Sequence, residues 1–359
     1  MGNLGSSRYS DPVLEHEHIA ELIALEAELC KRSLYDYLRA MWPVIEPSTP
    51  FIDGFHIGAM AEHQQAVFDG QIKKLIINVC PRSGKSICTS IALPTWGWTR
   101  NPATRFLFSS YSSDLSLEFA TTARRVIEST WYQTRWDIQL SGDQNNKAFY
   151  ANTASGYRIS TSVGGSATGK GGDLLVVDDP HNLKTINSDI VRTEDVRWFF
   201  KVWSSRINNK KFDRQIVIMQ RGHEDDLTAA LKEQGDWTIL KLPTEYQRTS
   251  WTSPIGWSDP RTTEGELLNP DRIGPEENAT IKAELGSIDY SCQHAQNPLP
   301  EKGGMFERTW FEVVDAPPAD VVARVRFWDA AGSETERSPY TAGVLMSCLL
   351  YTSDAAENR

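Results

Sequence analysis

The stretch KKLIINVCPRSGKSICTS, residues 73–90, decides how this sequence is interpreted. It begins with an apolar run, passes through a short segment of Pro, Ser and Gly, and ends where a helix is expected to start. Backbone N–H groups at such a strand-to-helix junction can bind phosphate, because they point at the anion from the positive end of the helix dipole. The order of these parts therefore predicts a phosphate-binding loop.

The loop departs at one position from the common pattern G-x-x-x-x-G-K-[ST], because Val79 stands where the first glycine is expected. That glycine makes the tight turn after the strand. The pair Cys80-Pro81 can also set a turn, since proline fixes φ. A chance occurrence of Gly-Lys-Ser remains the alternative for this motif taken alone.

Each loop residue has an expected role in binding ATP. Gly84 allows close backbone approach, Lys85 supplies a cation to the β- and γ-phosphates, and Ser86 offers a hydroxyl to Mg²⁺. The predicted ATP-binding residues are Arg82, Ser83, Gly84, Lys85 and Ser86.

The segment LLVVDDPH (174–181) is an apolar run that ends in two acids. In phosphate-loop ATPases the first acid at such a strand end helps to hold Mg²⁺. The second can orient and deprotonate the attacking water. We therefore assign Asp178 as a metal ligand and Asp179 as the catalytic base; a solvated carboxylate pair is the alternative.

The segment IVIMQRGHEDDL (216–227) has the form of a strand followed by Arg221, His223 and an acidic helix start. An arginine at a strand end near the γ-phosphate can sense hydrolysis, which makes Arg221 a candidate catalytic residue. A surface loop is the other interpretation of this segment.

Short apolar runs closed by turn residues recur along the chain. Helical spacing of apolar residues fills 56–69, 114–130 and 188–204. Continuous apolar runs are typical of strands buried on both faces, and their alternation with helices predicts an α/β domain with a mainly parallel sheet and flanking helices. The expected strands are LIINV (75–79), RFLFSSY (105–111), LLVVDD (174–179), RQIVIMQ (214–220) and WTILKL (237–242).

The bulk composition is that of an ordinary globular protein. The 359 residues carry a net charge of −10, which argues against a general nucleic-acid coat but not against a local DNA-binding surface. No apolar run approaches the ~20 residues of a membrane helix. The five cysteines lack zinc spacing and are expected to be reduced thiols in a cytosolic protein.

In this order, the motifs resemble those of the large terminase subunit of tailed bacteriophages, the ATP-driven motor that packages DNA into a procapsid. The similarity extends over roughly residues 50–347. It is carried by INVCPRSGKS (77–86), SSYSSDLS (109–116), SVGGSATGKGGDLLVVDDP (162–180), MQRGHEDDL (219–227), QNPLPEKGGMF (296–306) and RFWDAAGSETERSPYTAGVLM (326–346).

The resemblance implies an N-terminal P-loop ATPase that drives DNA and a C-terminal nuclease of RNase H-like fold. It implies ATP and Mg²⁺ as cofactors, and two divalent metals in the complete nuclease domain. Arg82 matches the family's loop arginine, which can act in cis like an arginine finger, with a structural ion pair as the alternative. Asp329 matches the first metal-binding acid of the nuclease.

The chain is accordingly divided into five parts. These are a helical lead-in (1–50), the P-loop ATPase domain (51–245), a connecting subdomain or linker (246–318), the start of the RNase H-like nuclease domain (319–347) and a tail (348–359).

The last part of the sequence departs from the family pattern. We expect 324–329 and 341–346 to pair as antiparallel strands, with Asp329 at or near the end of the first. The segment SCLLYTSDAAENR (347–359) continues neither the strand pattern nor the family. We expect residues from about Cys348 to be non-native on a truncated gene, a natural polar tail being the alternative. On this interpretation the nuclease site is incomplete, and the chain hydrolyses ATP without cutting DNA.

The resemblance also implies partners and a location. The partners are double-stranded DNA, the portal protein and the small terminase subunit, with a homo-oligomeric ring on the procapsid and no membrane. The location is the cytoplasm of the infected bacterium, transiently at the portal. Another DNA translocase or helicase-like ATPase, or a catalytically silent structural packaging component, are the alternatives; the first would need a second RecA-like domain.

Two segments are candidates for DNA contact. Residues 196–214 interleave basic side chains with Trp198 and Trp203, and basic groups serve phosphates. A solvated helix face with core tryptophans is the alternative. The Gly-rich loop 164–172, with Lys170, is the second candidate.

Overall fold

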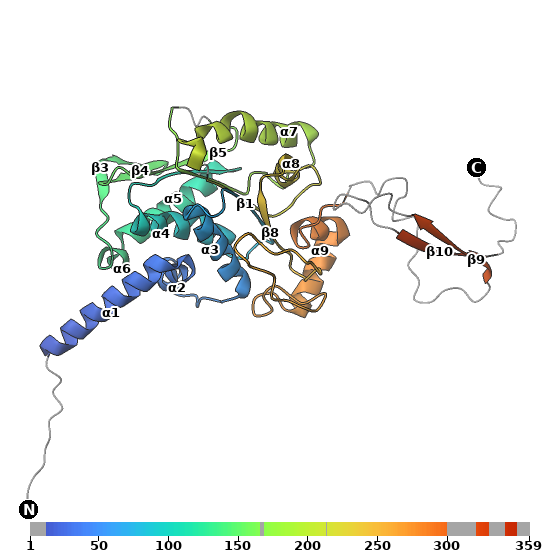
Figure 1. Ribbon diagram of the computed structural model, residues 1–359, viewed down its shortest axis with the longest axis horizontal. Coiled ribbons are helices and arrows are strands. Elements are labelled where there is room, and N and C mark those ends of the chain that lie inside the picture. Colours follow the sequence, from blue (N-terminus) through green and yellow to red (C-terminus); the bar gives the residue numbers. More distant parts are fainter. Residues whose placement is uncertain (1–11, 166–168, 213, 300–320, 330–341, 350–359) are drawn as a thin grey trace, which may run out of the picture. The chain divides into compact units, whose positions relative to one another are not determined.

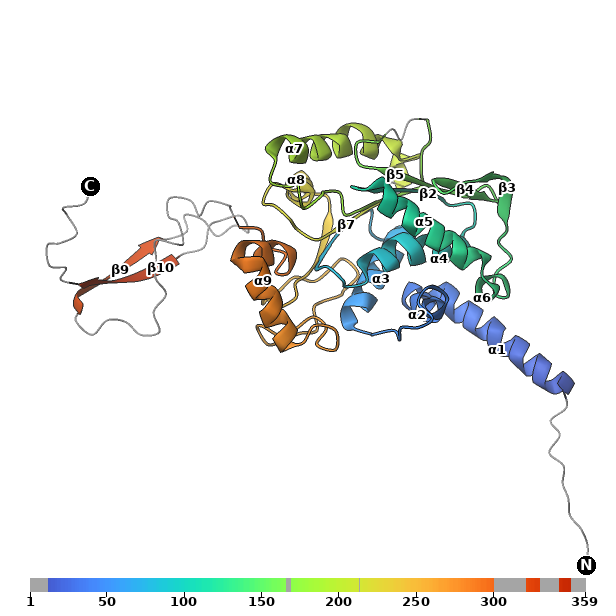
Figure 2. The ribbon, with the colours of Figure 1, turned by 180° about the vertical axis from the view of Figure 1, so that it is seen from behind.

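The structure is a computed structural model that describes residues 12–165, 169–212, 214–299, 321–329 and 342–349. The chain forms two compact units, Met1–Glu301 and Lys302–Arg359. The first unit consists of a central sheet with helices on both faces (Figures 1 and 2).

The sheet has eight strands in the order β3-β4-β5-β2-β6-β7-β1-β8. From β5 to β8 all neighbouring pairs are parallel, whereas β3, β4 and β5 pair antiparallel. The strands are β1 (Lys74–Val79), β2 (Arg105–Ser110), β3 (Leu140–Asn145), β4 (Phe149–Asn152), β5 (Tyr157–Ser162), β6 (Leu174–Asp178), β7 (Gln215–Met219) and β8 (Thr238–Leu242). The predicted α/β class with a mainly parallel sheet is confirmed.

The helices divide between the two faces of this sheet. Two hydrophobic cores result, one beneath α2 to α6 and one beneath α7, α8 and the π-helical segment η2 (Phe199–Trp203). The helices are α1 (Pro12–Arg32), α2 (Leu34–Ile45), α3 (Phe55–Phe68), α4 (Leu93–Arg100), α5 (Ser113–Glu128), α6 (Thr130–Gln133), α7 (Asp189–Trp198), α8 (Leu227–Gln234) and α9 (Pro275–Gln293). Further short segments are π-helical η1 (Ile87–Ala92) and the 3₁₀ turns η3 (Ser204–Arg206) and η4 (Lys210–Phe212).

The five expected strands are present. Four of them, β1, β2, β6 and β7, are buried over most or all of their length, as the apolar run of a doubly covered parallel strand predicts, whereas the edge strand β8 is only partly buried. All five residues of β6 and all five of β7 are buried. Strands β3, β4 and β5 were not predicted from the sequence, because their residues are polar or alternate between buried and half-buried positions. Helix α9 was not predicted either, since its residues were expected to be irregular. Its helical geometry is broken at Gly286 (φ 73°).

The second unit contains the antiparallel pair of β9 (Val321–Asp329) and β10 (Ala342–Leu349). The predicted hairpin is confirmed, and Asp329 is the last residue of β9, opposite Ala342. β10 continues to Leu349, beyond the residue at which the strand pattern was expected to end. The remainder of the predicted tail, 350–359, lies outside the described residues.

Among the helices of the described ranges, none combines the length and apolar content that are needed to cross a bilayer.

Candidate nucleotide site

The phosphate-loop segment lies between the end of β1 and a helical turn that starts at Lys85. The Ser83 hydroxyl donates to the Cys80 carbonyl at 2.8 Å, which closes the loop on itself. The backbone at Arg82 (φ 61°) and Gly84 (φ 80°) is left-handed. Glycine adopts this conformation freely, whereas for arginine it is uncommon and tends to occur at functional sites.

The helix that follows the loop opens with a π-helical turn, η1. Such turns are rare and are often found at functional sites. Ser86 and Ser90 lie on the same side of this turn, and both donate to the carboxylate of Asp178, at 3.1 Å from Ser86 Oγ and 2.7 Å from Ser90 Oγ. The loop and the end of β6 are thereby joined.

Asp178 is the last residue of β6 and only 2% of it is exposed. Burial, followed by the charge of Asp179, raises the pKa of its carboxyl to about 6. The Ser90 hydrogen bond, the Lys85 charge and the Ser86 hydrogen bond act in the opposite direction. The site therefore holds an acid whose charged form is disfavoured until a cation is present.

Asp179 follows with a left-handed backbone (φ 49°). Its Oδ2 lies 3.2 Å from Lys85 Nζ, and its Oδ1 accepts from the backbone N–H of Gln220 at 3.3 Å. Burial opposes the charge of Lys85, but Asp179 and then Asp178 outweigh it, so the pKa of Lys85 is raised. Lys85 therefore stays protonated in the site.

A cavity of about 890 Å³ opens over these groups. Its walls come from α2, the phosphate loop, α5 and residue 272. It is lined by Trp42, Ile45, Glu46, Pro81, Arg82, Gly84, Lys85, Ser86, Ile87, Ile91, Tyr111, Leu115, Glu118, Phe119, Thr122, Arg125, Asp179 and Arg272.

Four of the predicted site residues lie together in the structure. Lys85, Ser86, Asp178 and Asp179 meet at the end of the sheet. Arg82 is exposed on the cavity wall and, within the described part of the chain, makes no hydrogen bond or ion pair.

Arg221 lies outside that group, in the turn after β7. Arg221 Nε donates to both carboxylate oxygens of Asp226, at 2.9 and 2.7 Å, and Arg221 lines a different hollow. Asp226 also caps α8 by accepting from Ala229 N–H, so this ion pair fixes the start of that helix. Asp329 belongs to the second unit, and its side chain lies outside the described residues.

Two oxygen atoms in the site suit Mg²⁺. Ser86 Oγ and Asp178 Oδ1 lie 3.1 Å apart, and hydroxyl and carboxylate oxygens are ligands that this ion prefers. Within the described ranges, no cluster of three or more His, Cys, Asp or Glu forms a metal site. Mg²⁺ commonly takes few protein ligands and completes its shell with water and substrate phosphates.

Two cavity residues, Arg125 and Arg272, were not identified from the sequence. Arg125 is one of several polar residues on α5, and nothing in its spacing marks it. Arg272 belongs to the segment described as a linker. Neighbouring contacts fix this segment, since Asn269 Nδ2 donates to the Asp53 carbonyl at 3.2 Å. A cavity-lining cation in a polar linker has no local sequence signal.

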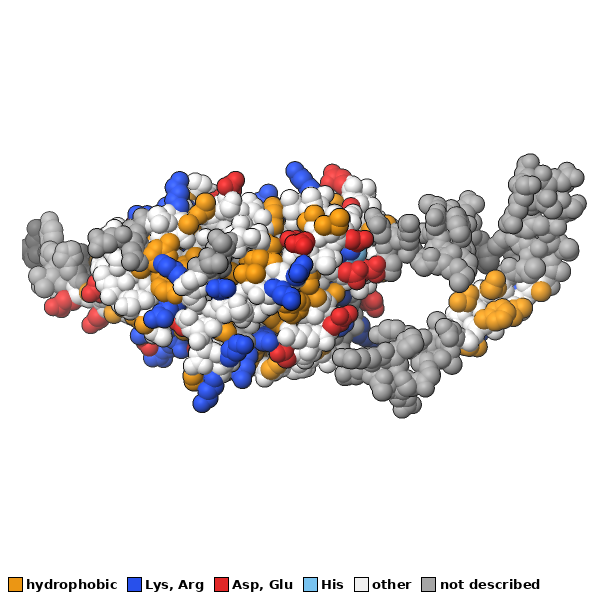
Figure 3. Space-filling view, turned by 90° about the horizontal axis from the view of Figure 1, so that it is seen from above, with side chains coloured by type: hydrophobic (Ala, Val, Ile, Leu, Met, Phe, Trp, Pro, Cys, Tyr) orange, Lys and Arg blue, Asp and Glu red, His pale blue; other side chains and the backbone are white. Residues whose placement is uncertain are grey.

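The candidate DNA segments have mixed environments. Trp198 and Trp203 are buried and stack on each other at 5.3 Å between ring centroids, so they belong to the core. The Lys170 ammonium lies 3.4 Å from the Phe149 ring centroid. Lys and Arg side chains are scattered among hydrophobic ones over the face in Figure 3.

No protein-family model matches the chain, and no curated protein matches it. The large terminase of a thermophilic bacteriophage matches with a TM-score of 0.40 and 9% identity, covering 64% of this chain and 52% of that one. The HK97 bacteriophage large terminase matches with a TM-score of 0.38 and 13% identity, covering 59% and 44%. The large terminase ATPase domain of Thermus phage P74-26 gives 0.38 and 11%, covering 66% and 92%.

The chain thus spans about half the length of the first two of these proteins. The first was also solved in complex with ADP, and that structure matches with a TM-score of 0.39 and 10% identity, covering 80% of this chain and 64% of that one. TM-scores near 0.4 mean that only part of each architecture superposes.

Proposed function

We propose that this protein is a Mg²⁺-dependent ATPase whose site is the cavity over the phosphate loop. The observation that carries the proposal is the convergence of the Lys85 ammonium, the Ser86 hydroxyl and the Asp179 carboxylate on that cavity, with the buried carboxylate of Asp178 directly behind Ser86. Lys85 Nζ lies 3.2 Å from Asp179, and Ser86 Oγ lies 3.1 Å from Asp178. The volume of about 890 Å³ is within the range of small-molecule sites.

The Lys85–Asp179 ion pair gives the site a way to respond to substrate. Phosphate oxygens compete with Asp179 for Lys85, and a bound triphosphate takes the ammonium from the carboxylate. Asp179 Oδ2 is then free to accept the proton of the attacking water, as a general base does. The Gln220 N–H on Oδ1 keeps the carboxylate oriented while this happens.

Ser86 and Asp178 would hold Mg²⁺, which would supply positive charge to neutralise the phosphates. The raised pKa of Asp178 indicates that its charged form is stabilised once a cation arrives. Arg82 stands exposed at the cavity wall, where it can contact the γ-phosphate.

We further propose that ATP hydrolysis by this protein drives viral DNA packaging. It rests on the ordered motifs of the sequence that resemble large terminase subunits. In that role the ATPase moves double-stranded DNA as part of a ring at the portal, together with the small terminase subunit. Asp329 at the end of β9 would then belong to the nuclease.

A steady-state ATPase assay with Mg²⁺, with and without double-stranded DNA, tests both the proposed ATP hydrolysis and its proposed role in moving DNA. Lys85→Ala should abolish hydrolysis because the γ-phosphate loses its cation, whereas Lys147→Ala, at an exposed lysine outside the cavity, should leave it unchanged. Hydrolysis near the wild-type rate in Lys85→Ala would remove the loop from the mechanism. Hydrolysis that DNA does not stimulate would retain the ATPase but count against the motor.

A further inference from the structure

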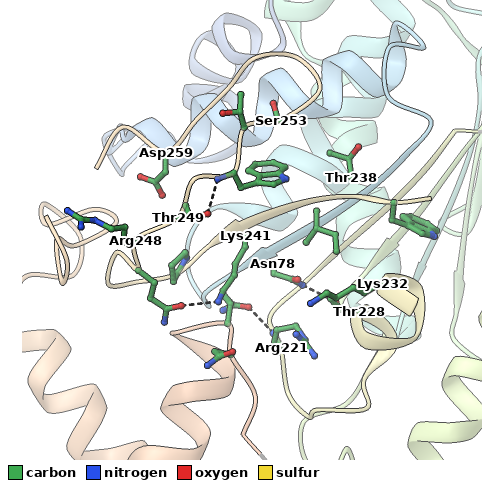
Figure 4. A pocket seen from close by; sticks show the side chains of 18 of the residues that line it. Asn78, Arg221, Thr228, Lys232, Thr238, Lys241, Arg248, Thr249, Ser253 and Asp259 are labelled. Carbon is green, nitrogen blue, oxygen red and sulfur yellow. Dashed lines mark hydrogen bonds between the residues drawn. The ribbon is translucent and has the colours of Figure 1, made fainter. Parts of the chain in front are cut away.

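A second hollow of about 750 Å³ lies beside β8, the strand at the edge of the sheet. Its walls are α8, one side of β8, the loop 247–254 and residues 296–297 (Figure 4). The residues of the phosphate loop do not line it. It is therefore separate from the nucleotide site.

The hollow carries an excess of positive charge. Four cations line it, Arg221, Lys232, Lys241 and Arg248, against a single acid, Asp259. That acid is neutralised outside the hollow, since it lies 2.8 Å from Arg261 Nη2.

Three of the four cations are left without a countercharge. Arg221 is neutralised by Asp226, at 2.7 Å. Lys232, Lys241 and Arg248 make no ion pair with any residue that the structure describes.

Lys241 shows the effect of the neighbouring positive charges. Its ammonium donates to Gln247 Oε1 at 2.9 Å, a neutral partner. Desolvation by the walls, followed by the charges of Arg221 and Lys232, lowers its pKa to about 8. Like charges gathered in one hollow repel one another, and an anion placed between them would remove that repulsion.

The remaining lining fits an oxyanion with several oxygens. Thr249, Thr252 and Ser253 bring hydroxyl donors from the loop, and Trp237 and Trp251 supply apolar walls. Ammonium and guanidinium groups form short, charge-assisted hydrogen bonds to phosphate.

We propose that this hollow is a second anion site, which binds a phosphate-bearing ligand through Lys232, Lys241 and Arg248. The phosphate groups belong either to a free polyphosphate or to a nucleic-acid backbone, because both present the same oxygens. The volume accommodates a small molecule of nucleotide size.

Direct binding to the full chain tests the proposal without reference to ATP hydrolysis. The hollow variant is Lys232→Gln/Lys241→Gln, which keeps a polar side chain and removes two charges. The matched control is Lys147→Gln/Lys184→Gln, which removes two charges from exposed lysines outside the hollow. Inorganic pyrophosphate is titrated by calorimetry, and a fluorescently labelled duplex of about two helical turns by anisotropy. The two control lysines are exposed, and circular dichroism checks that each variant is folded.

The hollow variant should bind pyrophosphate, the duplex or both at least tenfold more weakly than the control, which should match wild type. A loss for pyrophosphate alone assigns a free phosphate compound to the hollow. A loss of affinity for the duplex that is larger at low salt than at high salt assigns the nucleic-acid backbone to the hollow. Equal affinities of the hollow variant and the control for both probes would overturn the proposal, and Lys85→Ala then shows whether the phosphate loop accounts for the binding.

Discussion

Replacing Asp178 by asparagine should stabilise the protein while it abolishes ATP hydrolysis. The introduced amide keeps the size of the side chain and can still accept from one serine and donate to the other, so the contacts with Ser86 and Ser90 survive. The variant loses the buried charge and its repulsion with Asp179, which together hold the pKa of Asp178 at about 6. It also loses the carboxylate that would hold Mg²⁺.

The magnitude follows from proton linkage. The carboxyl has a pKa of about 6 in the folded protein against 3.8 in the reference state. Between these values the folded state binds more protons than the unfolded state, so the free energy of unfolding falls as pH rises. A tenfold difference in proton affinity is worth about 1.36 kcal/mol, which gives a penalty of about 3 kcal/mol above pH 7 and about half of that at pH 5.

The assay is thermal unfolding of both proteins at pH 5 and pH 7.5, with EDTA and without nucleotide. Asp178→Asn should melt higher at pH 7.5, by roughly 6 °C or more for a domain of this size, and the difference should shrink at pH 5. Asp271→Asn, at an exposed carboxylate, is the control and should shift little at either pH. A variant that melts lower than wild type at pH 7.5, or a difference that does not change with pH, would refute the reasoning.

Three further substitutions test other parts of the structure. Asp179→Asn should retain nucleotide binding while turnover falls by a factor on the order of 10² or more, the scale of a lost general base; loss of binding would make it a metal ligand instead. Arg82→Ala should lower turnover at least tenfold and leave the melting temperature within about 2 °C, because the side chain is exposed; a large loss of stability would indicate a structural ion pair. Gly97→Ala should destabilise by about 1–3 kcal/mol in urea unfolding, since its Cβ would lie 2.7 Å from Phe106 Cζ, whereas Gly58→Ala, with nothing within 4 Å, should not destabilise.

The parts of the fold that were predicted are those whose burial leaves a continuous apolar run. β6 and β7 are covered on both faces, and each reads as four or more apolar residues in sequence. β5 pairs with β2 on one side and with the short antiparallel β4 on the other. Its sequence YRISTS alternates between apolar and polar residues and contains Arg158. This arginine is buried, with its Cζ 4.2 Å from the Phe108 ring centroid, and no local sequence pattern predicts that contact.

In the candidate site, too, some residues could be predicted from local sequence and others could not. Lys85, Ser86 and the two acids were predicted because their chemistry is tied to strand ends, and parallel strands bring their carboxyl ends to one edge. Ser90 was missed since its role depends on the π-helical turn, which sequence spacing does not reveal. Arg272 was missed since tertiary contacts of a polar segment place it in the cavity.

The turn after β7 contacts residues of both the nucleotide cavity and the cationic hollow, and the strand order explains why. β7 lies between β6, which ends in Asp178, and β1, which leads into the phosphate loop. The first residue of the turn, Gln220, donates its N–H to Asp179, and the next, Arg221, donates its N–H to Gln296 Oε1 at 2.9 Å and faces the cationic hollow. Because these are consecutive peptide units, a shift of Asp179 on phosphate binding would be coupled through this turn to the position of Arg221. Any such coupling is reciprocal, so an anion in the hollow must alter nucleotide affinity by the factor with which nucleotide alters the affinity of the hollow.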